Sequence, residues 1–463
     1  MLRCSLKAMT VDFGAYNETF YAYVTPDVAT FYNETPGSRA QQNPRFRGLF
    51  GKFINLGPET IRVYWVPDAK GEDPVYISDV EPFGSAGTAT YPNHNFIVTT
   101  TSDVNKVLTR WKINAGESLY YYDPFGSPQK AVKALNEEQM PLYGMQYVNK
   151  LFAEQYKKIT GRDYLALYKQ KMPPRFHMWR PEAIGDTFTI ETKEIHFVDL
   201  PPAADIDRGA SAYGPRPDQI AQMRKYRAKY PTMNLTLTAL SCAPRVFEIQ
   251  NFLSDLEVAH LLDIAAKKKL TRSSTKSGEG SQETAPDRTR TSTNDWIGRG
   301  TDIITDAIYR RAADILQMDE ALLRWRRASE IPEFPESMIS VSERLQLVHY
   351  DVGQQYTPHH DFTMPPLVAM QPSRFATVLF YLNDDMKGGE TSFPRWLNSE
   401  TREALKVKPE KGKAILFYNI LPDGNYDERS QHAAMPVTEG EKWLTNLWVW
   451  DPVLDHTAEV DNE

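Results

Sequence analysis

The first third of the chain consists of short apolar runs separated by polar turns. Within residues 60–66, Ile61, Val63 and Trp65 fall on one face of an extended chain, as a half-buried strand requires. Similar runs rich in Val, Ile, Tyr and Phe occupy residues 52–56, 74–80, 95–100, 106–113 and 117–122. Six short runs at this spacing predict an all-β sandwich.

The middle of the chain changes to a helical pattern. Apolar residues recur at helical spacing from Met145 to Ile159, and Gly161 is placed to end the helix. Residues 186–200 alternate between apolar and polar and predict one or two strands, and residues 201–231 turn to Pro, Gly, Ala and charge. We therefore divide the chain into a sandwich, a helical connector with a linker, a second domain and a tail, at residues 1–128, 129–232, 233–455 and 456–463.

Composition narrows the class of protein. The chain has 463 residues, of which 41% are hydrophobic, and a formal net charge of −7, which is typical of a globular protein. The mild acidity and the lack of a polybasic motif argue against a nucleic-acid partner, and no apolar stretch approaches the length that spans a bilayer. Cys4 and Cys242 are the only cysteines, so a disulfide between them stays an open question.

Candidate chemistry is concentrated in the last quarter of the chain. In a strand, His359 and Asp361 project to one side while His360 between them points away. A third ligand, His432, follows the apolar run 414–418, which predicts a buried strand. Two imidazoles and one carboxylate that leave other positions open suit a non-haem Fe(II) oxygenase. An isolated His-x-Asp triplet is nevertheless a weak signal, so its surroundings must decide.

Lys442 follows ten residues after His432 and begins the apolar run 443–450. A hairpin between these two segments would bring the cation close to the metal ligands. Three protein ligands on an octahedral Fe(II) leave room for a bidentate 2-oxo acid and O2, and a buried cation would pair with the far carboxylate of 2-oxoglutarate. The sequence therefore predicts Lys442 as the anchor for this co-substrate.

Three blocks around these residues resemble the prolyl 4-hydroxylase family of 2-oxoglutarate dioxygenases. They read LQLVHYDVGQQYTPHHDF, RFATVLFYLNDDMKGGETSFP and VKPEKGKAILFYNILPDGNYDERSQHAAMPVTEGEKWLTNLWVW, in the order of the family's catalytic blocks. The resemblance covers residues 240–452 and implies a double-stranded β-helix, or jelly roll. The fold class that we expect is therefore multidomain and mainly β with helices, with an N-terminal β-sandwich and a C-terminal double-stranded β-helix oxygenase domain.

The resemblance also implies roles for individual residues. It makes His359, Asp361 and His432 the iron ligands and Lys442 the 2-oxoglutarate anchor, with Tyr350 and Thr391 supporting that co-substrate. The residues that would line the proline pocket are Tyr356, Arg374 and Trp448. In the family the polar segment 267–293 closes over a proline-rich peptide, and Arg290 at its end is a further candidate substrate contact, whereas composition alone favours a solvated connection with no role. Taken singly, each aromatic residue is more often part of a core. His360 stands where the family usually has an aromatic residue.

The activity implied is 4-hydroxylation of prolyl residues in peptides or proteins, with Fe(II), 2-oxoglutarate and O2 as cofactor and co-substrates and L-ascorbate as reductant. The alternatives are a related oxygenase that acts on another residue or a small molecule, and a peptide-binding scaffold whose oxygenase fold is idle. The family favours the lumen of the endoplasmic reticulum, but the N-terminus lacks the apolar segment of a signal peptide, so a cytoplasmic location is the alternative. The substrate motif and the oligomeric state stay open.

Residues 45–125 resemble the β domain of the von Hippel-Lindau tumour suppressor in their strand order, the YWV run and the PFGS turn. That resemblance implies a site for a hydroxyproline peptide, yet a fold does not fix a function. A plain packing module is the simpler interpretation, with His94 an ordinary loop histidine.

Overall fold

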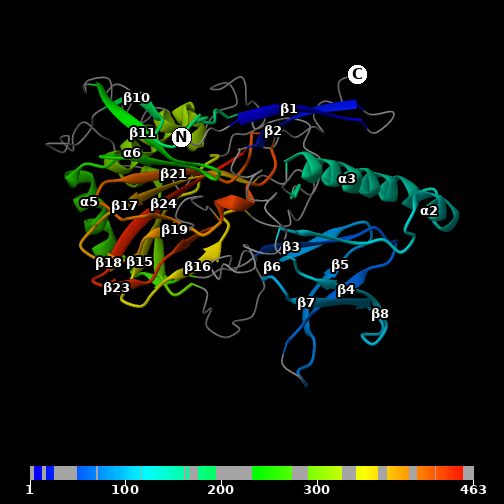
Figure 1. Cartoon of the computed structure of the whole chain (residues 1–463). Coiled ribbons are helices and arrows are strands. Elements are labelled where there is room, and N and C mark those ends of the chain that lie inside the picture. Colours follow the sequence, from blue (N-terminus) through cyan, green and yellow to red (C-terminus); the bar gives the residue numbers. More distant parts are fainter. Residues whose placement is uncertain are drawn as a thin grey trace.

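A small β domain and a larger one lie side by side, and helices run along one side of the small domain (Figure 1). The computed structural model describes residues 5–12, 17–24, 49–68, 71–114, 116–160, 163–165, 176–193, 232–273, 290–325, 340–362, 373–395, 404–422 and 424–451. An antiparallel pair, β1 (Ser5–Asp12) and β2 (Asn17–Val24), precedes the small domain and was not predicted.

The small domain contains two sheets. The first sheet has the strand order β6-β3-β9 and consists of β6 (Ser85–Thr90), β3 (Leu49–Asn55) and β9 (Leu119–Tyr122). The second sheet has the strand order β5-β4-β7-β8 and consists of β5 (Val75–Val80), β4 (Ile61–Val66), β7 (Asn95–Thr100) and β8 (Val107–Lys112). Phe53 and Tyr120 of the first sheet share one buried core with Val63 and Val98 of the second. The two sheets thus pack face to face, as predicted for a sandwich.

All six predicted runs are strands, but strand β6 was missed. Its sequence, SAGTAT, contains only small residues and none of the large apolar side chains that mark a strand. Strand β6 also lies very close to the neighbouring strand β3. A Cβ at Gly51 of β3 would lie only 3.1 Å from the Thr90 side chain of β6, which leaves little room for larger side chains at this contact.

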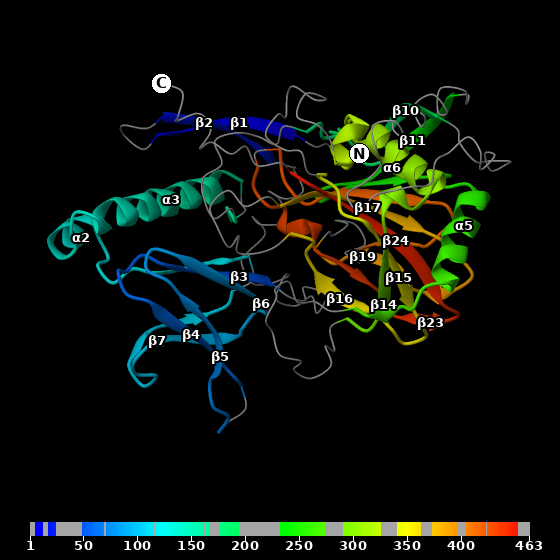
Figure 2. The ribbon, with the colours of Figure 1, turned by 180° about the vertical axis from the view of Figure 1, so that it is seen from behind.

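Helices α2 (Pro128–Ala134) and α3 (Gln139–Thr160) follow the sandwich and cover one side of it (Figure 2). Ala131 and Tyr143 pack on Ile54, Leu56 and Phe83 of the sandwich. The predicted helical stripe is buried at Phe152 and Tyr156, whereas Met145 is 42% exposed. The predicted stripe is thus only partly buried, and the buried connector residues that pack on the sandwich, Ala131 and Tyr143, lie outside it.

The larger domain is built on a sheet of nine strands in the order β10-β11-β12-β21-β17-β24-β15-β14-β13. The strands are β10 (Thr187–Lys193), β11 (Thr232–Cys242), β12 (Arg245–Ile249), β13 (Thr271–Arg272), β14 (Thr293–Ile297), β15 (Leu345–Tyr350), β17 (Arg374–Tyr381), β21 (Ala414–Tyr418) and β24 (Lys442–Trp450). Strand β10 lies within the predicted connector and extends this sheet.

A smaller sheet faces the nine-stranded one. Its strands, in the order β16-β22-β19-β20, are β16 (Tyr356–His359), β22 (His432–Ala434), β19 (Thr391–Phe393) and β20 (Leu405–Val407); the short strands β18 (Lys387–Gly388) and β23 (Val437–Glu439) pair beside it. Tyr381 and Phe417 of the large sheet pack against Phe393 of the small one. This mainly β arrangement of two facing sheets agrees with the expected oxygenase domain.

The opposite face of the large sheet is covered by helices. Phe380 and Leu416 of the sheet share a core with Leu261 of α5 (Asp255–Ala266) and Ile308 of α6 (Ile303–Leu316). Ser254 begins α5 with a capping box to Glu257. Short 3-10 helices lie at Arg299–Thr301 (η2), Glu320–Leu323 (η3) and Glu428–Ser430 (η5).

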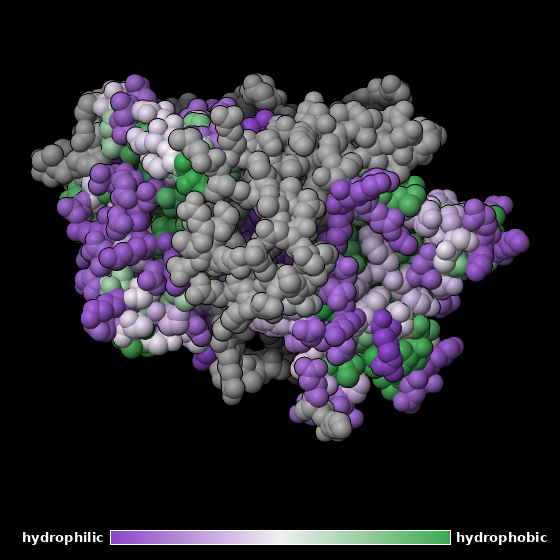
Figure 3. All heavy atoms as spheres, viewed as in Figure 1, coloured by the Kyte–Doolittle hydropathy of each residue, from purple (hydrophilic) through white to green (hydrophobic). Residues whose placement is uncertain are grey.

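Several sequence predictions lie wholly or partly outside the described residues, namely Cys4, most of the polar segment 267–293, the linker 201–231 and the tail. Cys242 is disulfide-bonded. Among the described helices, none has both the length and the apolar composition needed to cross a membrane. On the face drawn in Figure 3, hydrophilic residues dominate the coloured surface and the apolar patches are small.

Candidate metal centre and active site

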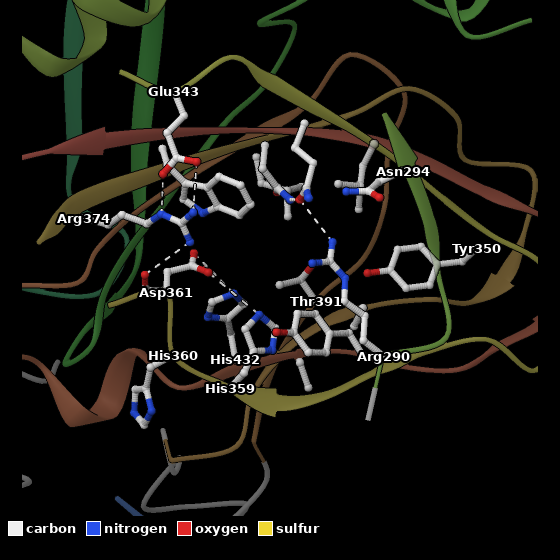
Figure 4. Close-up of a pocket in the computed structure, with 18 of the residues that line it drawn as sticks. Arg290, Asn294, Glu343, Tyr350, His359, His360, Asp361, Arg374, Thr391 and His432 are labelled. Carbon is white, nitrogen blue, oxygen red and sulfur yellow. Dashed lines mark hydrogen bonds and ion pairs between the residues drawn. The ribbon is translucent and has the colours of Figure 1, made fainter. Parts of the chain in front are cut away.

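His359 and His432 are brought together by strand pairing. His359 is the last residue of β16 and His432 is the first residue of β22, and the two are directly opposite in the antiparallel register. Asp361 lies two residues beyond the end of β16, so the prediction that one strand carries both His359 and Asp361 was wrong for the carboxylate. The bend after His359 still turns Asp361 toward both imidazoles (Figure 4).

The three side chains are close enough to share one metal ion. His359 Nε2 is 3.9 Å from Asp361 Oδ1, and His432 Nε2 is 3.6 Å from Asp361 Oδ2. Asp361 and His432 are buried, and His359 is half-buried. Because metal bonds from such ligands are about 2 Å long, the distances fit a shared ion. His360 lies apart from them, as predicted, and its Nε2 donates to the Glu428 carbonyl.

Backbone carbonyls set the tautomer of both imidazoles. The Nδ1 of His359 is 2.9 Å from the Thr357 carbonyl, and the Nδ1 of His432 is 3.0 Å from the Ser430 carbonyl. A carbonyl can only accept, so both Nδ1 atoms donate a proton to it, and Nε2 is the ring atom left to face a metal. Burial and the neighbouring His432 also hold the pKa of His359 well below its usual value. His359 is therefore neutral, the form that binds metal.

Asp361 stays ionised although it is buried. Burial by itself raises the pKa of this carboxyl, but the nearby His432, His359 and Arg374 and a hydrogen bond from Thr377 outweigh it and bring the pKa to about 2. Thr377 Oγ1 donates to Asp361 Oδ2 at 2.7 Å. Two imidazoles and one carboxylate therefore face one point, a donor set that suits Fe(II).

A buried cation lies further into the same cavity. Lys442 is fully buried; its Nζ donates to the Gly389 carbonyl at 2.5 Å and lies 5.5 Å from the Tyr350 ring centroid and 5.6 Å from that of Tyr381. Burial lowers the pKa of Lys442 to about 7. Lys442 begins β24 as predicted, but β24 and β22 belong to different sheets, so the expected hairpin between His432 and Lys442 was wrong.

Arg374 and Trp448 form the opposite wall. The Arg374 guanidinium lies 3.7 Å from the Trp448 ring centroid and is held by Glu343, with distances of 2.6 Å and 3.0 Å to the two carboxylate oxygens. The Trp448 Nε1 is buried and has no hydrogen-bond partner among the described residues. This wall therefore offers a planar cation, an aromatic face and one N–H group.

Arg290 and Tyr356 complete the wall near the metal ligands. The Tyr356 ring is stacked on His359, with ring centroids 3.5 Å apart, and the Arg290 guanidinium lies 4.8 Å from the Tyr356 centroid. Arg290 donates to the neutral acceptors Ser292 Oγ and Gln346 Oε1. Within the described part of the chain, no carboxylate pairs with this buried guanidinium. Among the described residues, only neutral groups accept hydrogen bonds from its side chain.

The structure places every predicted site residue on the wall of one cavity of about 570 Å³. These residues are Arg290, Tyr350, Tyr356, His359, Asp361, Arg374, Thr391, His432, Lys442 and Trp448. Sequence reasoning missed Glu343, which pairs with Arg374, Thr377, which binds Asp361, and Tyr381, whose hydroxyl donates to Thr391 at 2.7 Å. None of these three residues is part of a recognisable sequence motif, and each lies beside its partner only in the folded structure.

A second group of metal-binding side chains lies on the surface. His349, Asp351 and Glu441 have donor atoms close together, but Asp351 and Glu441 are exposed. His349 Nε2 is 2.7 Å from Glu441 Oε2, which an ordinary hydrogen bond explains. The buried triad is the stronger metal site.

Residues 345–450 match the family model of the 2OG-Fe(II) oxygenase superfamily. The chain is also 32% identical over 246 residues to probable prolyl 4-hydroxylase 7 of Arabidopsis thaliana, an alignment that covers 50% of this chain and 71% of that protein. This chain belongs to the 2OG-Fe(II) oxygenase superfamily. The family implies Fe(II) and 2-oxoglutarate, which agrees with the triad.

Other relatives of this oxygenase carry similar names. Prolyl 4-hydroxylase 2 of Arabidopsis thaliana is 34% identical over 236 residues, which are 47% of this chain and 72% of that protein. Among solved structures, the viral collagen prolyl hydroxylase of Paramecium bursaria Chlorella virus 1 is 26% identical and covers 45% of this chain and 96% of its own, with a TM-score of 0.34. The residues that match the family model, 345–450, include the His359, Asp361 and His432 triad and Lys442.

Proposed function

We propose that this oxygenase is a peptidyl-prolyl 4-hydroxylase that depends on Fe(II) and 2-oxoglutarate. The observation that carries the proposal is that one cavity combines the His359, Asp361 and His432 triad with the buried ammonium of Lys442. Relatives that are 32% to 34% identical and carry the name prolyl 4-hydroxylase support proline as the target.

The residues present fit a ferrous ion. His359 and His432 would each supply the Nε2 atom, because Nδ1 is used in a backbone hydrogen bond, and Asp361 would supply a carboxylate oxygen. When bound, Fe(II) together with 2-oxoglutarate and O2 supplies an oxidation in which 2-oxoglutarate becomes succinate and CO2 and one oxygen atom enters the prolyl C4–H bond. L-ascorbate would serve as the reductant after uncoupled turnovers.

Lys442 would bind the far carboxylate of 2-oxoglutarate. Its ammonium is buried on the cavity wall, with a carbonyl and two aromatic rings around it. A charge-assisted hydrogen bond to a carboxylate is stronger here than in water because the site is shielded from solvent. Tyr350, whose ring lies beside Lys442, and Thr391, which accepts from Tyr381, also line the cavity and would support this carboxylate.

Arg374, Trp448, Tyr356 and Arg290 would hold the peptide. The Trp448 ring and the edge of the Tyr356 ring offer apolar surface for a pyrrolidine ring, and the N–H groups of Arg374 and Arg290 would donate to peptide carbonyls. Glu343 fixes the plane of the Arg374 guanidinium through both carboxylate oxygens. The residues around the oxidised C–H bond thus position the substrate and do not themselves react.

Two alternatives are separated by experiment. A related oxygenase that acts on another residue or on a small molecule would release succinate without a proline-containing peptide, whereas a scaffold with an idle oxygenase domain would bind peptide without releasing succinate. The test is succinate release by the purified chain with Fe(II), 2-oxoglutarate and a panel of proline-containing peptides, followed by mass spectrometry. A gain of one oxygen atom on proline is expected. Peptide-dependent succinate release with the oxygen on another residue would reject the proposal.

A further inference from the structure

The contact between the sandwich and the oxygenase domain reaches the turn that precedes His432. Ser118 is 1% exposed and stands directly before β9 of the sandwich. Its backbone N–H donates to Asp163 Oδ2 at 2.5 Å, and its hydroxyl donates to Glu428 Oε1 at 3.2 Å. Glu428 begins η5, which ends at Ser430, two residues before His432. A sandwich hydroxyl therefore bonds to the segment that carries the distal metal ligand.

A second connection runs through residues 163–165. The side chain of Asn425, at the start of the same turn, donates to the Asp163 carbonyl at 3.0 Å and accepts from the Leu165 N–H at 2.8 Å. From the other side, the buried Nζ of Lys52 in β3 donates to the Leu165 carbonyl at 3.0 Å. Residues 163–165 therefore link the sandwich to the turn at residues 425–431.

Glu428 is also linked to residues that are adjacent in sequence to all three candidate metal ligands. Its carboxylate pairs with Arg395, and its carbonyl accepts from His360 Nε2 at 2.9 Å. Arg395 Nε in turn donates to Gln431 Oε1 at 2.9 Å. His360 lies between His359 and Asp361, and Gln431 precedes His432. Displacing Glu428 would therefore disturb both chain segments that supply metal ligands.

The orientation of His432 depends on this turn. Its Nδ1 donates to the carbonyl of Ser430, the last residue of η5, so the position of η5 decides where Nε2 points. Groups that orient metal ligands in this way commonly change metal affinity by about 10-fold to 100-fold when they are removed. The Ser118 hydroxyl acts one contact further out and should have a smaller effect.

We propose that the N-terminal sandwich is a positioning module for the metal centre, with Ser118 acting through Glu428 to hold the turn that aims His432. The inference rests on the metal centre of the proposed function. It assigns the sandwich a role in the oxygenase domain that differs from gripping peptide and from passive packing. Ser118 and Glu428 are positioning residues in this scheme, because neither faces the cavity where substrate would bind.

The test is a titration of the metal-free full chain with Co(II), followed by its d–d absorption, with far-UV circular dichroism to check folding. Ser118→Ala should weaken Co(II) binding by about 3-fold to 10-fold, and Glu428→Ala by about 10-fold to 100-fold with an altered spectrum. Glu428→Gln keeps an acceptor for Ser118 and should fall between wild type and Glu428→Ala. The matched control is Thr60→Ala, which removes a hydroxyl-to-carboxylate bond of 3.2 Å to Glu81 at an exposed site on the sandwich, and should bind Co(II) as wild type does.

Wild-type Co(II) affinity and spectrum in folded Ser118→Ala and Glu428→Gln would overturn the inference. So would a higher KM for peptide in Ser118→Ala with unchanged Co(II) affinity, because that pattern marks a substrate contact. If wild type binds Co(II) but oxidises no proline, the proposed function fails while the positioning role is still measured. If wild type binds no Co(II), both proposals fail.

Discussion

At one end of the cavity, His359 and His432 are oriented by carbonyls only two residues away in their own chain, whereas at the other end Arg374, Glu343 and Trp448 hold one another from distant parts of the chain. The metal-binding end therefore depends directly on the local backbone of β16 and of the turn before β22, and the proposed substrate end depends on an ion pair and an aromatic contact between distant residues. This difference predicts that substitutions at one end leave the other end's ligand affinity largely intact. The predictions below test that separation.

The largest effect is expected for His359→Ala. Removing one of three ligands should abolish succinate release and weaken Co(II) binding by at least about 100-fold, because the remaining two ligands cannot hold the ion in place. Metal titration and turnover assays measure both effects. His94→Ala, which changes a histidine on the sandwich, serves as the control. Full activity in His359→Ala would reject the ligand assignment.

Lys442→Met should raise the KM for 2-oxoglutarate by about 100-fold while Co(II) affinity stays within about twofold. The substitution removes the buried ammonium but keeps an apolar stem of similar length, and losing one charged hydrogen bond costs about 1.5 to 3 kcal/mol. Steady-state kinetics and metal titration separate the two effects. An unchanged KM would contradict the role of Lys442 as anchor.

Loss of the proton from Lys442 should set the pH dependence of 2-oxoglutarate binding. Burial lowers the pKa of Lys442 to about 7, a shift that Glu390 partly opposes. Without co-substrate the ammonium loses its proton as the pH rises through 7, so affinity for the dianion should fall by up to about tenfold per pH unit above 7. Lys442→Arg, which stays charged, should flatten this dependence in binding measurements from about pH 6.5 to 9. An equally steep fall in that variant would place the titration elsewhere.

The contribution of Lys442 to folding stability changes with pH in the opposite direction to the affinity for 2-oxoglutarate. Between pH 7 and about 10.4 the unfolded chain binds more protons at this lysine than the folded chain does, so the contribution to stability rises with pH across that window. Any loss of co-substrate affinity in this range therefore cannot be ascribed to unfolding driven by Lys442.

Glu343→Gln should have the smallest effect of the four, a rise of about fivefold to tenfold in the KM for peptide. The amide cannot pair with both guanidinium nitrogens, so Arg374 loses its fixed plane above Trp448. Affinities for Co(II) and 2-oxoglutarate should not change. A parallel loss of metal affinity would show that the two ends are coupled and would break the comparison.

The same contrast explains what the sequence could predict. Six strands of the sandwich follow local patterns of alternation and were predictable, and the candidate ligands and Lys442 were found from their spacing together with the resemblance of three sequence blocks to a known family. Glu343, Thr377 and Tyr381 act through partners 31, 16 and 10 residues away, and nothing in their own neighbourhood marks them. Strand β6 was missed because its small residues pack closely against β3 and carry no apolar signal. The contacts of Ser118 with Glu428, 310 residues apart, lie equally beyond local pattern.

The direct pairing of His359 with His432 makes the metal centre sensitive to errors in strand alignment. A slip of one residue between β16 and β22 would place Gln431 or Ala433 opposite His359 and turn the distal imidazole to the other side of the small sheet. Misaligned chains could not chelate a metal ion through all three groups. A ferrous-binding measurement would therefore report correct assembly of this sheet. Iron binding would in this way distinguish molecules with the correct strand register from molecules with a shifted one.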